Sequence, residues 1–434
     1  MTPPSSIGDR IRARRLLRGW SIRYAASRAG VSHASWSRIE RGLQAADNRF
    51  MLADLAAALD CSPTDLAGTA VPAADREAVA AHARVSAVRQ ALVEADLNEP
   101  LEQGGGSNRQ PEQHGGLSEP PERHGDLREP PEQRGGLNRP PGRPAELGRA
   151  LALVDQLRRA CDYAGAARLL PDLLRGLHAA GAGPERAAAL RQLCDATFIA
   201  SSVLRNLGCP AEAWLGAERC RDAAHAAQDP ILRGYAEYAR ACAAAACGSY
   251  ERAYAIAERA VNGLCGHTGK PGGTAVLGTL QLMCAQSARG SRRPGDSRAW
   301  LDEAAALARG TGETATMGLY FGPTNVAIWR IGIEADGGEP GRAVAIARGT
   351  DPAVIAAGFR QVFYYADTAR ALARVRGRDR EAIRYLLIAE RIAPQHLHTS
   401  AMAQETTRAL LERSRRAAGG SELRGLCTRM QIAV

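Results

Sequence analysis

A ten-residue sequence that repeats near the middle of the chain limits most strongly what the chain can fold into. The segment "SEPPERHGDL" is followed directly by "REPPEQRGGL", and related copies on both sides extend the period over residues 98–144. Neither a helix nor a strand has a ten-residue period, and the paired prolines and glycines remove backbone donors and raise chain entropy. We therefore predict a disordered linker over residues 98–144 that separates two folded units.

Composition and cysteine use narrow the class of protein. The chain has 434 residues, 45% of them hydrophobic, which is enough for folded cores on both sides of the linker. No apolar run is long enough to span a membrane, and the start "MTPPSSIGDR" lacks the apolar segment of a secretion signal, so we expect a cytoplasmic protein. The ten cysteines include no CxxC pair, and His114 and His124 recur only because the repeat recurs. We expect no metal site, no disulfide framework and no cofactor.

Positive charge concentrates at the N-terminus. Residues 1–49 hold ten arginines against Asp9, Glu40 and Asp47, and the whole chain has a net charge of +10. Such a cluster is typical of a surface that binds nucleic acid.

Residues 1–70 are predicted to form five short helices. Residues typical of helix termini mark their ends, with Gly19, Gly30 and Gly42 as terminators and Ser21, Ser32 and Ser62 as N-caps. The two helices joined across Gly30 form a helix-turn-helix, whose second helix can lie in the major groove of double-stranded DNA.

This domain resembles the phage-repressor and Cro-like helix-turn-helix family, often called XRE. The resemblance rests on Arg15, Ser21, Ala26, Gly30, Val31 and the run "RIERG" that ends at Gly42. It implies a structural ion pair between Arg15 and Glu40 that ties the first helix to the third.

The resemblance also implies which residues read DNA. His33, Ala34 and Arg38 would face base edges, while Ser32 and Ser35 would help with backbone or base contacts. The residues themselves agree in part, because burial of Trp36 and Ile39 turns His33, Ser37 and Arg38 outward, and arginine bonds guanine bidentately.

Two positions depart from the family pattern. Ile22 stands where the family usually has a glutamine that bonds a phosphate, so Arg23 or Arg10 would have to hold the DNA backbone instead. Ala25 stands where the family prefers leucine. An alternative reading is a helix-turn-helix that contacts protein, although the excess of arginine favours phosphate.

Residues 73–96 are predicted to form one connecting helix with an apolar seam of alternating three- and four-residue spacing. The seam is short and half alanine. It indicates either a helix docked on its own domain or a coiled-coil dimer contact.

Residues 145–434 are predicted to form a helical-repeat domain. A recurring phrase places alanine at a fixed offset, at Ala166, Ala213, Ala253, Ala299, Ala343 and Ala382. The pattern resembles tetratricopeptide repeats, although its spacing exceeds the ~34 residues typical of that family. The resemblance implies an all-α solenoid of about six hairpins with a concave face that binds a peptide, a small molecule or a protein segment.

The stretch "TMGLYFGPTNVAIWR" is the candidate lining of that face. It gathers Tyr320, Phe321, Thr324, Asn325 and Trp329 in a domain where aromatic residues are scarce. The alternative is that these aromatics fill the space between hairpins. The stretch also resembles one in actinobacterial helix-turn-helix regulators with such repeats.

Taken together, these patterns predict a sequence-specific transcriptional regulator that binds DNA as a homodimer and senses a ligand through its repeats. No enzyme is expected, since the chain has no GxSxG, P-loop or HExxH motif. The alternative is a scaffold whose two domains both bind proteins.

Overall fold

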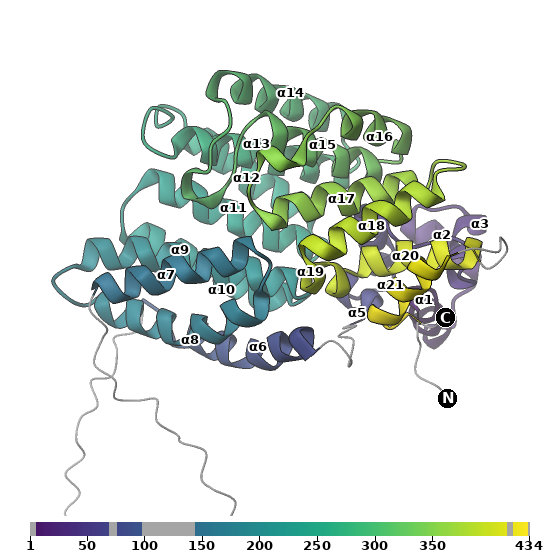
Figure 1. Cartoon of the computed structure of the whole chain (residues 1–434), viewed down its shortest axis with the longest axis horizontal. Helices are drawn as coiled ribbons and strands as arrows, with labels where there is room; N and C mark the ends of the chain where they lie inside the picture. The colour runs from purple at the N-terminus through teal and green to yellow at the C-terminus, as the bar shows by residue number, and fades with distance from the viewer. Residues whose placement is uncertain (1–5, 69–75, 98–143, 415–419, 433–434) are drawn as a thin grey trace, which may run out of the picture.

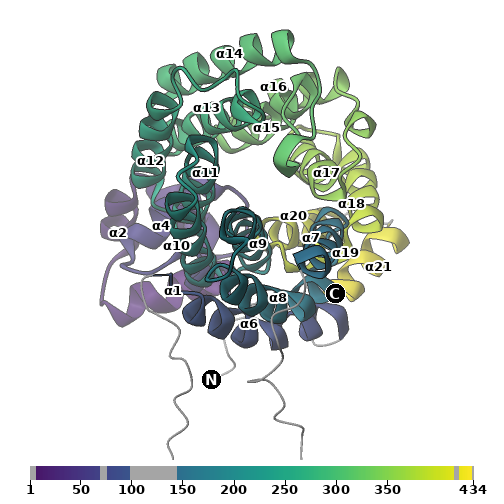
Figure 2. The same ribbon diagram turned by 90° about the vertical axis from the view of Figure 1, so that its left-hand side faces the viewer.

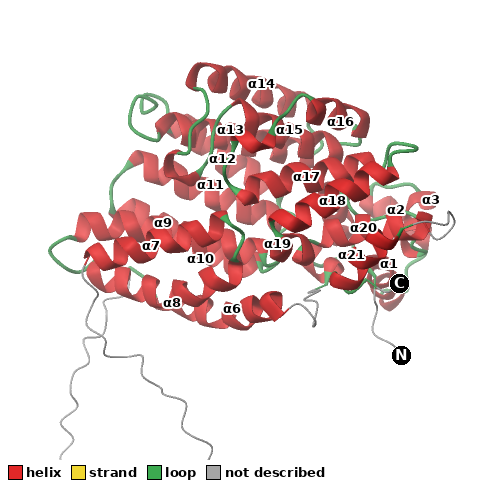
Figure 3. Cartoon of the chain, in the orientation of Figure 1, coloured by secondary structure: helices red, strands yellow, loops and turns green. Residues whose placement is uncertain are grey.

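The computed structural model describes residues 6–68, 76–97, 144–414 and 420–432. These residues form 21 α-helices and two short 3-10 helices, and the described parts of the chain contain no strand, which confirms the all-α prediction (Figure 3). The predicted linker lies outside the described residues, except for Pro144, which begins α7. Within the described ranges, no helix combines the length and apolar character needed to cross a membrane.

The N-terminal bundle has the five predicted helices. They are α1 (Ile7–Leu17), α2 (Ile22–Ala29), α3 (His33–Glu40), α4 (Arg49–Ala58) and α5 (Pro63–Ala67). Ser21, Ser32 and Ser62 cap α2, α3 and α5 through side-chain oxygens that accept backbone N–H groups. Gly30 ends α2 with a φ of 65°, a left-handed conformation that glycine adopts without steric cost and that starts the tight turn into α3.

The C-terminal domain contains six antiparallel helical hairpins among its described residues (Figure 1). Their helices are α7 (Pro144–Arg159) with α8 (Tyr163–Ala180), α9 (Arg186–Asn206) with α10 (Pro210–Ala226), α11 (Pro230–Ala246) with α12 (Tyr250–Gly263), α13 (Gly273–Gly290) with α14 (Pro294–Thr311), α15 (Pro323–Asp336) with α16 (Pro340–Arg348), and α17 (Gly358–Leu372) with α18 (Asp379–Ile392). Three helices follow, α19 (Pro394–Thr399), α20 (Ala401–Ser414) and α21 (Ser421–Arg429).

Small residues at the fourth position of each hairpin's second helix let paired helices approach closely. Five of the six predicted alanines occupy that position and are fully buried: Ala166, Ala213, Ala253, Ala343 and Ala382. The prediction was wrong for Ala299, which is exposed, because the matching buried residue in α14 is Ser297. Serine is nearly as small as alanine, so the packing rule holds although the residue type differs.

The hairpins wind round until the last meets the first (Figure 2). The Gln395 side chain in α19 accepts hydrogen bonds from the backbone N–H groups of Tyr163 and Ala164 at the start of α8, at 2.9 and 3.1 Å. The Tyr163 hydroxyl lies 2.7 Å from Nδ1 of His396. The solenoid of hairpins therefore closes on itself into a ring.

The connecting helix α6 (Arg76–Glu94) belongs to this ring. Val88 and Leu92 are buried in the same core as the first hairpin, and α6 packs on α8 and α10. Arg219 of α10 donates to the backbone oxygen of Leu92 at 2.8 Å. The buried seam of α6 therefore packs on the ring, whereas the sequence had suggested the N-terminal domain or a second copy as its partner.

Candidate nucleic-acid interface and interdomain cavity

A buried ion pair holds the N-terminal bundle together. Arg15 donates from Nε and Nη2 to the two carboxylate oxygens of Glu40, at 2.6 and 2.8 Å, and from Nη1 to the backbone oxygen of Trp20. The indole N–H of Trp36, which is fully buried, donates to the same carboxylate at 2.6 Å. This polar cluster ties α1 to α3 and orients the outer face of α3.

The outer face of α3 carries the side chains predicted to read DNA. Ser32, His33, Ala34 and Arg38 are exposed, while Ser35 and Ser37 are half-buried. Gln44, which no sequence pattern signals, accepts hydrogen bonds from Ser35 Oγ at 3.1 Å and from Arg38 Nε at 3.2 Å. Gln44 holds the Arg38 guanidinium across the end of α3. The remaining N–H donors of Arg38 stay available to a base.

The two arginines considered for the DNA backbone differ in their surroundings. Arg23 is exposed at the start of α2. Arg10 donates from its guanidinium to the backbone oxygens of Leu66 and Ala67 and so closes α5 against α1. Of the two, Arg23 is the more exposed, whereas Arg10 is engaged within the bundle.

The five candidate groove residues differ in burial and surroundings within the ring. Tyr320, Phe321 and Asn325 are buried, and Phe321 packs so closely that a Cβ on Gly278 would lie 2.1 Å from its ring. Thr324 is half-buried at the start of α15 and donates its backbone N–H to Glu313 at 2.7 Å. Trp329 is half-buried and lines a cavity.

The N-terminal bundle docks on the ring through a network of alternating charges. Arg49, at the start of α4, pairs with Asp336 of α15 at 2.6 Å and with Asp367 of α17 at 2.7 Å. Arg370 pairs with the same two carboxylates at 2.6 and 2.9 Å. A Cβ on Gly332 would lie 2.6 Å from the Asp367 carboxylate, so α15 needs a glycine where the network passes.

The segment that precedes α4 completes the network. The Asp47 carboxylate accepts hydrogen bonds from Arg374 and from the Thr406 hydroxyl, while its backbone oxygen accepts one from Arg370 at 2.6 Å. Asn48 donates to the backbone oxygen of Asp336. Three arginines thus face three aspartates, so the charges balance within the interface.

Burial strengthens these pairs. Arg370 is 1% exposed, and the Asp336 side chain is inaccessible to solvent. Burial alone would raise the pKa of Asp336, but the charges of Arg370 and Arg49 lower that pKa to about 2. Burial alone would lower the pKa of Arg370, but Asp336 and Asp367 raise it above its usual value. Both groups are therefore charged near neutral pH, and each stabilises the other.

Two further contacts bring the bundle against the ring. Phe50 of α4 and Tyr250 of α12 pack edge to face, with ring centroids 5.1 Å apart. Arg292, between α13 and α14, donates to the backbone oxygen of Ala29 at 3.2 Å and pairs with Asp54 at 2.9 Å. The docked side of the bundle thus includes α4, α5 and the end of α2, and the outer face of α3 is left exposed.

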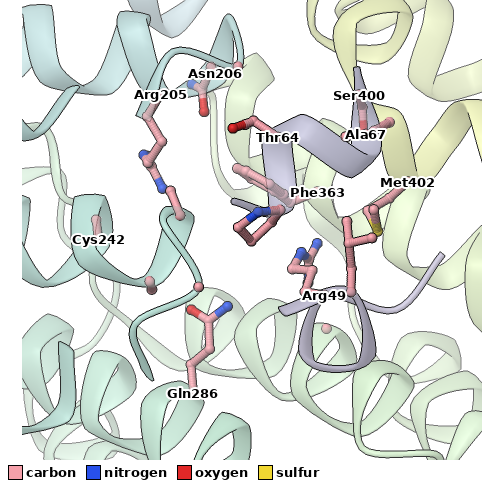
Figure 4. A pocket seen from close by; sticks show the side chains of 18 of the residues that line it. Arg49, Thr64, Ala67, Arg205, Asn206, Cys242, Gln286, Phe363, Ser400 and Met402 are labelled. Carbon is pink, nitrogen blue, oxygen red and sulfur yellow. The ribbon is translucent and has the colours of Figure 1, made fainter. Parts of the chain in front are cut away.

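A cavity of about 340 Å³ lies where the bundle meets the ring. The first helices of the hairpins line one side, with Tyr238, Cys242, Met283, Gln286, Trp329, Arg360 and Phe363 among them, and α4 and α5 line the other. Figure 4 shows Arg205 and Gln286 approaching from the ring and Arg49 and Thr64 from the N-terminal bundle. Neither periodicity nor motif signals such a cavity, because its walls come from segments far apart in the sequence.

Comparison with known proteins agrees with the bundle's geometry. Residues 6–68 match a family model described as "Helix-turn-helix domain". No curated protein and no solved structure matches the chain. The chain therefore carries a DNA-binding helix-turn-helix domain at residues 6–68, joined to a helical ring.

Proposed function

We propose that the protein is a sequence-specific transcriptional regulator in which α3 enters the major groove. The exposure of His33 and Arg38 on α3, while the bundle docks through α4, carries this proposal. Docking on the ring leaves the reading face open, and Gln44 holds Arg38 in place for a guanine.

The proposal has finer parts. The helix-turn-helix is of the XRE type, and the hairpins are tetratricopeptide-like. The protein is a homodimer, and its ring senses a ligand and has no enzymatic activity. One helix-turn-helix touches only a half-site, which supports a dimer on a two-fold operator. The ring supports sensing because its walls contact the DNA-binding domain directly around one cavity.

The test begins with selection of bound fragments from genomic DNA by the full chain. Arg38→Ala should then weaken binding to the selected site by about 1–3 kcal/mol and relax preference at one base pair, since one bidentate contact is lost. Arg309→Ala, which removes an exposed arginine of α14, is the matched control and should leave binding unchanged.

Salt dependence separates this function from the protein-binding scaffold. Phosphate contacts release counterions, so DNA affinity should fall steeply as salt rises. Failure to enrich any DNA fragment, or enrichment that Arg38→Ala leaves unchanged in affinity and sequence preference, would contradict the proposal.

A further inference from the structure

Two arginines in the interdomain cavity have no carboxylate partner among the described residues. Arg205, near the end of α9, and Arg360, in α17, both line the cavity. Asp367 lines it too, but its carboxylate is already shared by Arg49 and Arg370. The cavity wall therefore has an excess of positive charge.

Arg360 is the more informative of the two. Its residue is 9% exposed, and its Nε has no hydrogen-bond partner. Its guanidinium lies over the rings of Phe359, Phe363 and Trp329, at 4.9, 5.5 and 5.6 Å from their centroids. Aromatic faces fix the orientation of a cation but do not replace a counterion, so a buried guanidinium in this setting is costly unless an anion reaches it.

The rest of the wall suits an apolar body. Tyr238, Trp329 and Phe363 present aromatic surface, Met283 presents a thioether, and Gln286 offers one amide. A volume of about 340 Å³ fits a small molecule and leaves no room for a folded partner.

We propose that this cavity binds a small organic anion, whose carboxylate or phosphate group pairs with Arg205 and Arg360 and whose apolar body packs on Trp329 and Phe363. Arg49 lines the same cavity and holds α4 on the ring, so an occupant shares the cavity with a group that joins the two domains. The role of this site as a sensor rests on the proposed function, whereas the binding itself does not.

The first experiment uses two fluorescent probes with the same aromatic body. One is 8-anilinonaphthalene-1-sulfonate, and the other is N-phenyl-1-naphthylamine, which lacks the sulfonate. The full chain should bind one sulfonate probe per chain, at least about tenfold more tightly than the neutral probe, since a charge-assisted pair is worth more than 1 kcal/mol. Equal affinity for the two probes would overturn the proposal.

Variants locate the site. Arg205→Gln and Arg360→Gln should each weaken binding of the sulfonate probe by about tenfold or more while leaving the neutral probe unaffected. Arg309→Gln is the control on an exposed surface and should change neither probe. Thermal melting establishes that each variant folds; Arg205 is half-buried, so its variant remains informative if Arg360→Gln unfolds. Unchanged sulfonate binding in a folded Arg205→Gln chain would refute the site.

Competition distinguishes the anionic group. Displacement of the sulfonate probe by 1-naphthoate would assign a carboxylate ligand, and displacement by 1-naphthyl phosphate would assign a phosphate ligand. 1-Naphthalenemethanol has no anionic group. Displacement by it at the same concentration would show that the cavity binds apolar molecules without regard to charge, and would overturn the proposal.

DNA binding by the same preparations keeps the two proposals separate. A chain that binds its selected DNA but shows no anion preference refutes the cavity site and leaves the regulator. A chain that binds the sulfonate probe through Arg205 and Arg360 but binds no DNA refutes the regulator and leaves the site.

Discussion

Individual arginines of this protein differ in role because their surroundings differ. Arg15 and Arg38 lie on neighbouring helices of one bundle, yet Arg15 is 7% exposed and paired with Glu40, whereas Arg38 is exposed and its guanidinium donates to Gln44. Loss of a buried partner leaves a buried charge unpaired, whereas loss of an exposed partner leaves a group that water can solvate. The first substitution should therefore alter stability and the second recognition.

Arg15→Ala tests this division. It leaves the Glu40 carboxylate buried with the Trp36 indole as its remaining side-chain donor among the described residues, so the bundle should lose about 3 kcal/mol of stability. Thermal melting of the full chain measures the loss. Arg12→Ala, an exposed position on the same helix, should change stability by less than about 0.5 kcal/mol. An Arg15→Ala chain that melts like the wild type but no longer binds DNA would reverse the assignment.

Among the helices, α4 makes contacts between the two domains through its N-terminal residues. The first residues of α4 supply Arg49 and Phe50 to the ring, and α15 and α17 meet them with Asp336 and Asp367. Capping by Asn48 places both residues, because its side chain accepts the N–H groups of Phe50 and Met51 at 2.9 Å. The capped start of α4 is thus both a local helix signal and an interdomain contact.

Asp336→Asn should weaken this junction. It leaves the Arg370 and Arg49 guanidiniums with one carboxylate fewer, a loss of about 3–5 kcal/mol for a buried pair. Hydrogen exchange should become faster at the backbone of α4, where Arg49 N–H donates to Asp336 at 3.2 Å. Asp302→Asn, which breaks an exposed pair with Arg330, should leave the exchange unchanged. Equal exchange in both variants would show that the network does not hold α4.

The same network should respond to acid. The pKa of Asp336 lies at about 2 in the folded chain, below its ordinary value, so its contribution is present above about pH 4 and is lost as the pH falls toward 2. Asp336→Asn should remove that part of the acid sensitivity of α4 exchange, because an amide does not titrate in this range.

At the scale of the whole molecule, the position of α6 changes what the predicted linker connects. The described chain leaves the ring after α6 and returns to it at α7, so residues 98–143 join two helices of one folded body. The sequence had suggested that this segment separates two folded units, whereas α6 and α7 on either side of it both pack in the ring. The helix-turn-helix domain contacts the ring through Asp47, Arg49 and Phe50, and through Arg292 of the ring.

A dimer on DNA should therefore read half-sites at one strict spacing. Operators with graded spacers, tested on the full chain, should show a single optimum, and replacement of residues 98–143 by a Gly–Ser segment of equal length should leave that optimum unchanged. Tolerance of a half-site moved by a full helical turn would indicate that the bundle leaves the ring. A monomer by light scattering at micromolar concentration would contradict the dimer itself.

The sequence by itself determined the local structure of this protein. Ser21, Ser32 and Gly30 specified where α2 and α3 begin and end, because caps and left-handed turns depend on neighbouring residues alone. The pairing of Arg15 with Glu40 followed from a family resemblance, and the six hairpins followed from the recurrence of small residues at a repeated offset.

How those parts meet depends on long-range packing. Arg49 contacts Asp336 and Asp367, and Tyr163 contacts Gln395, across distances in sequence that no period or motif spans. The docking of α6 on the ring, the closure of the ring and the cavity with Arg205 and Arg360 arise from the same cause. Each depends on which apolar face finds the largest complementary surface and on which buried charges find partners, and both are properties of the packed chain as a whole.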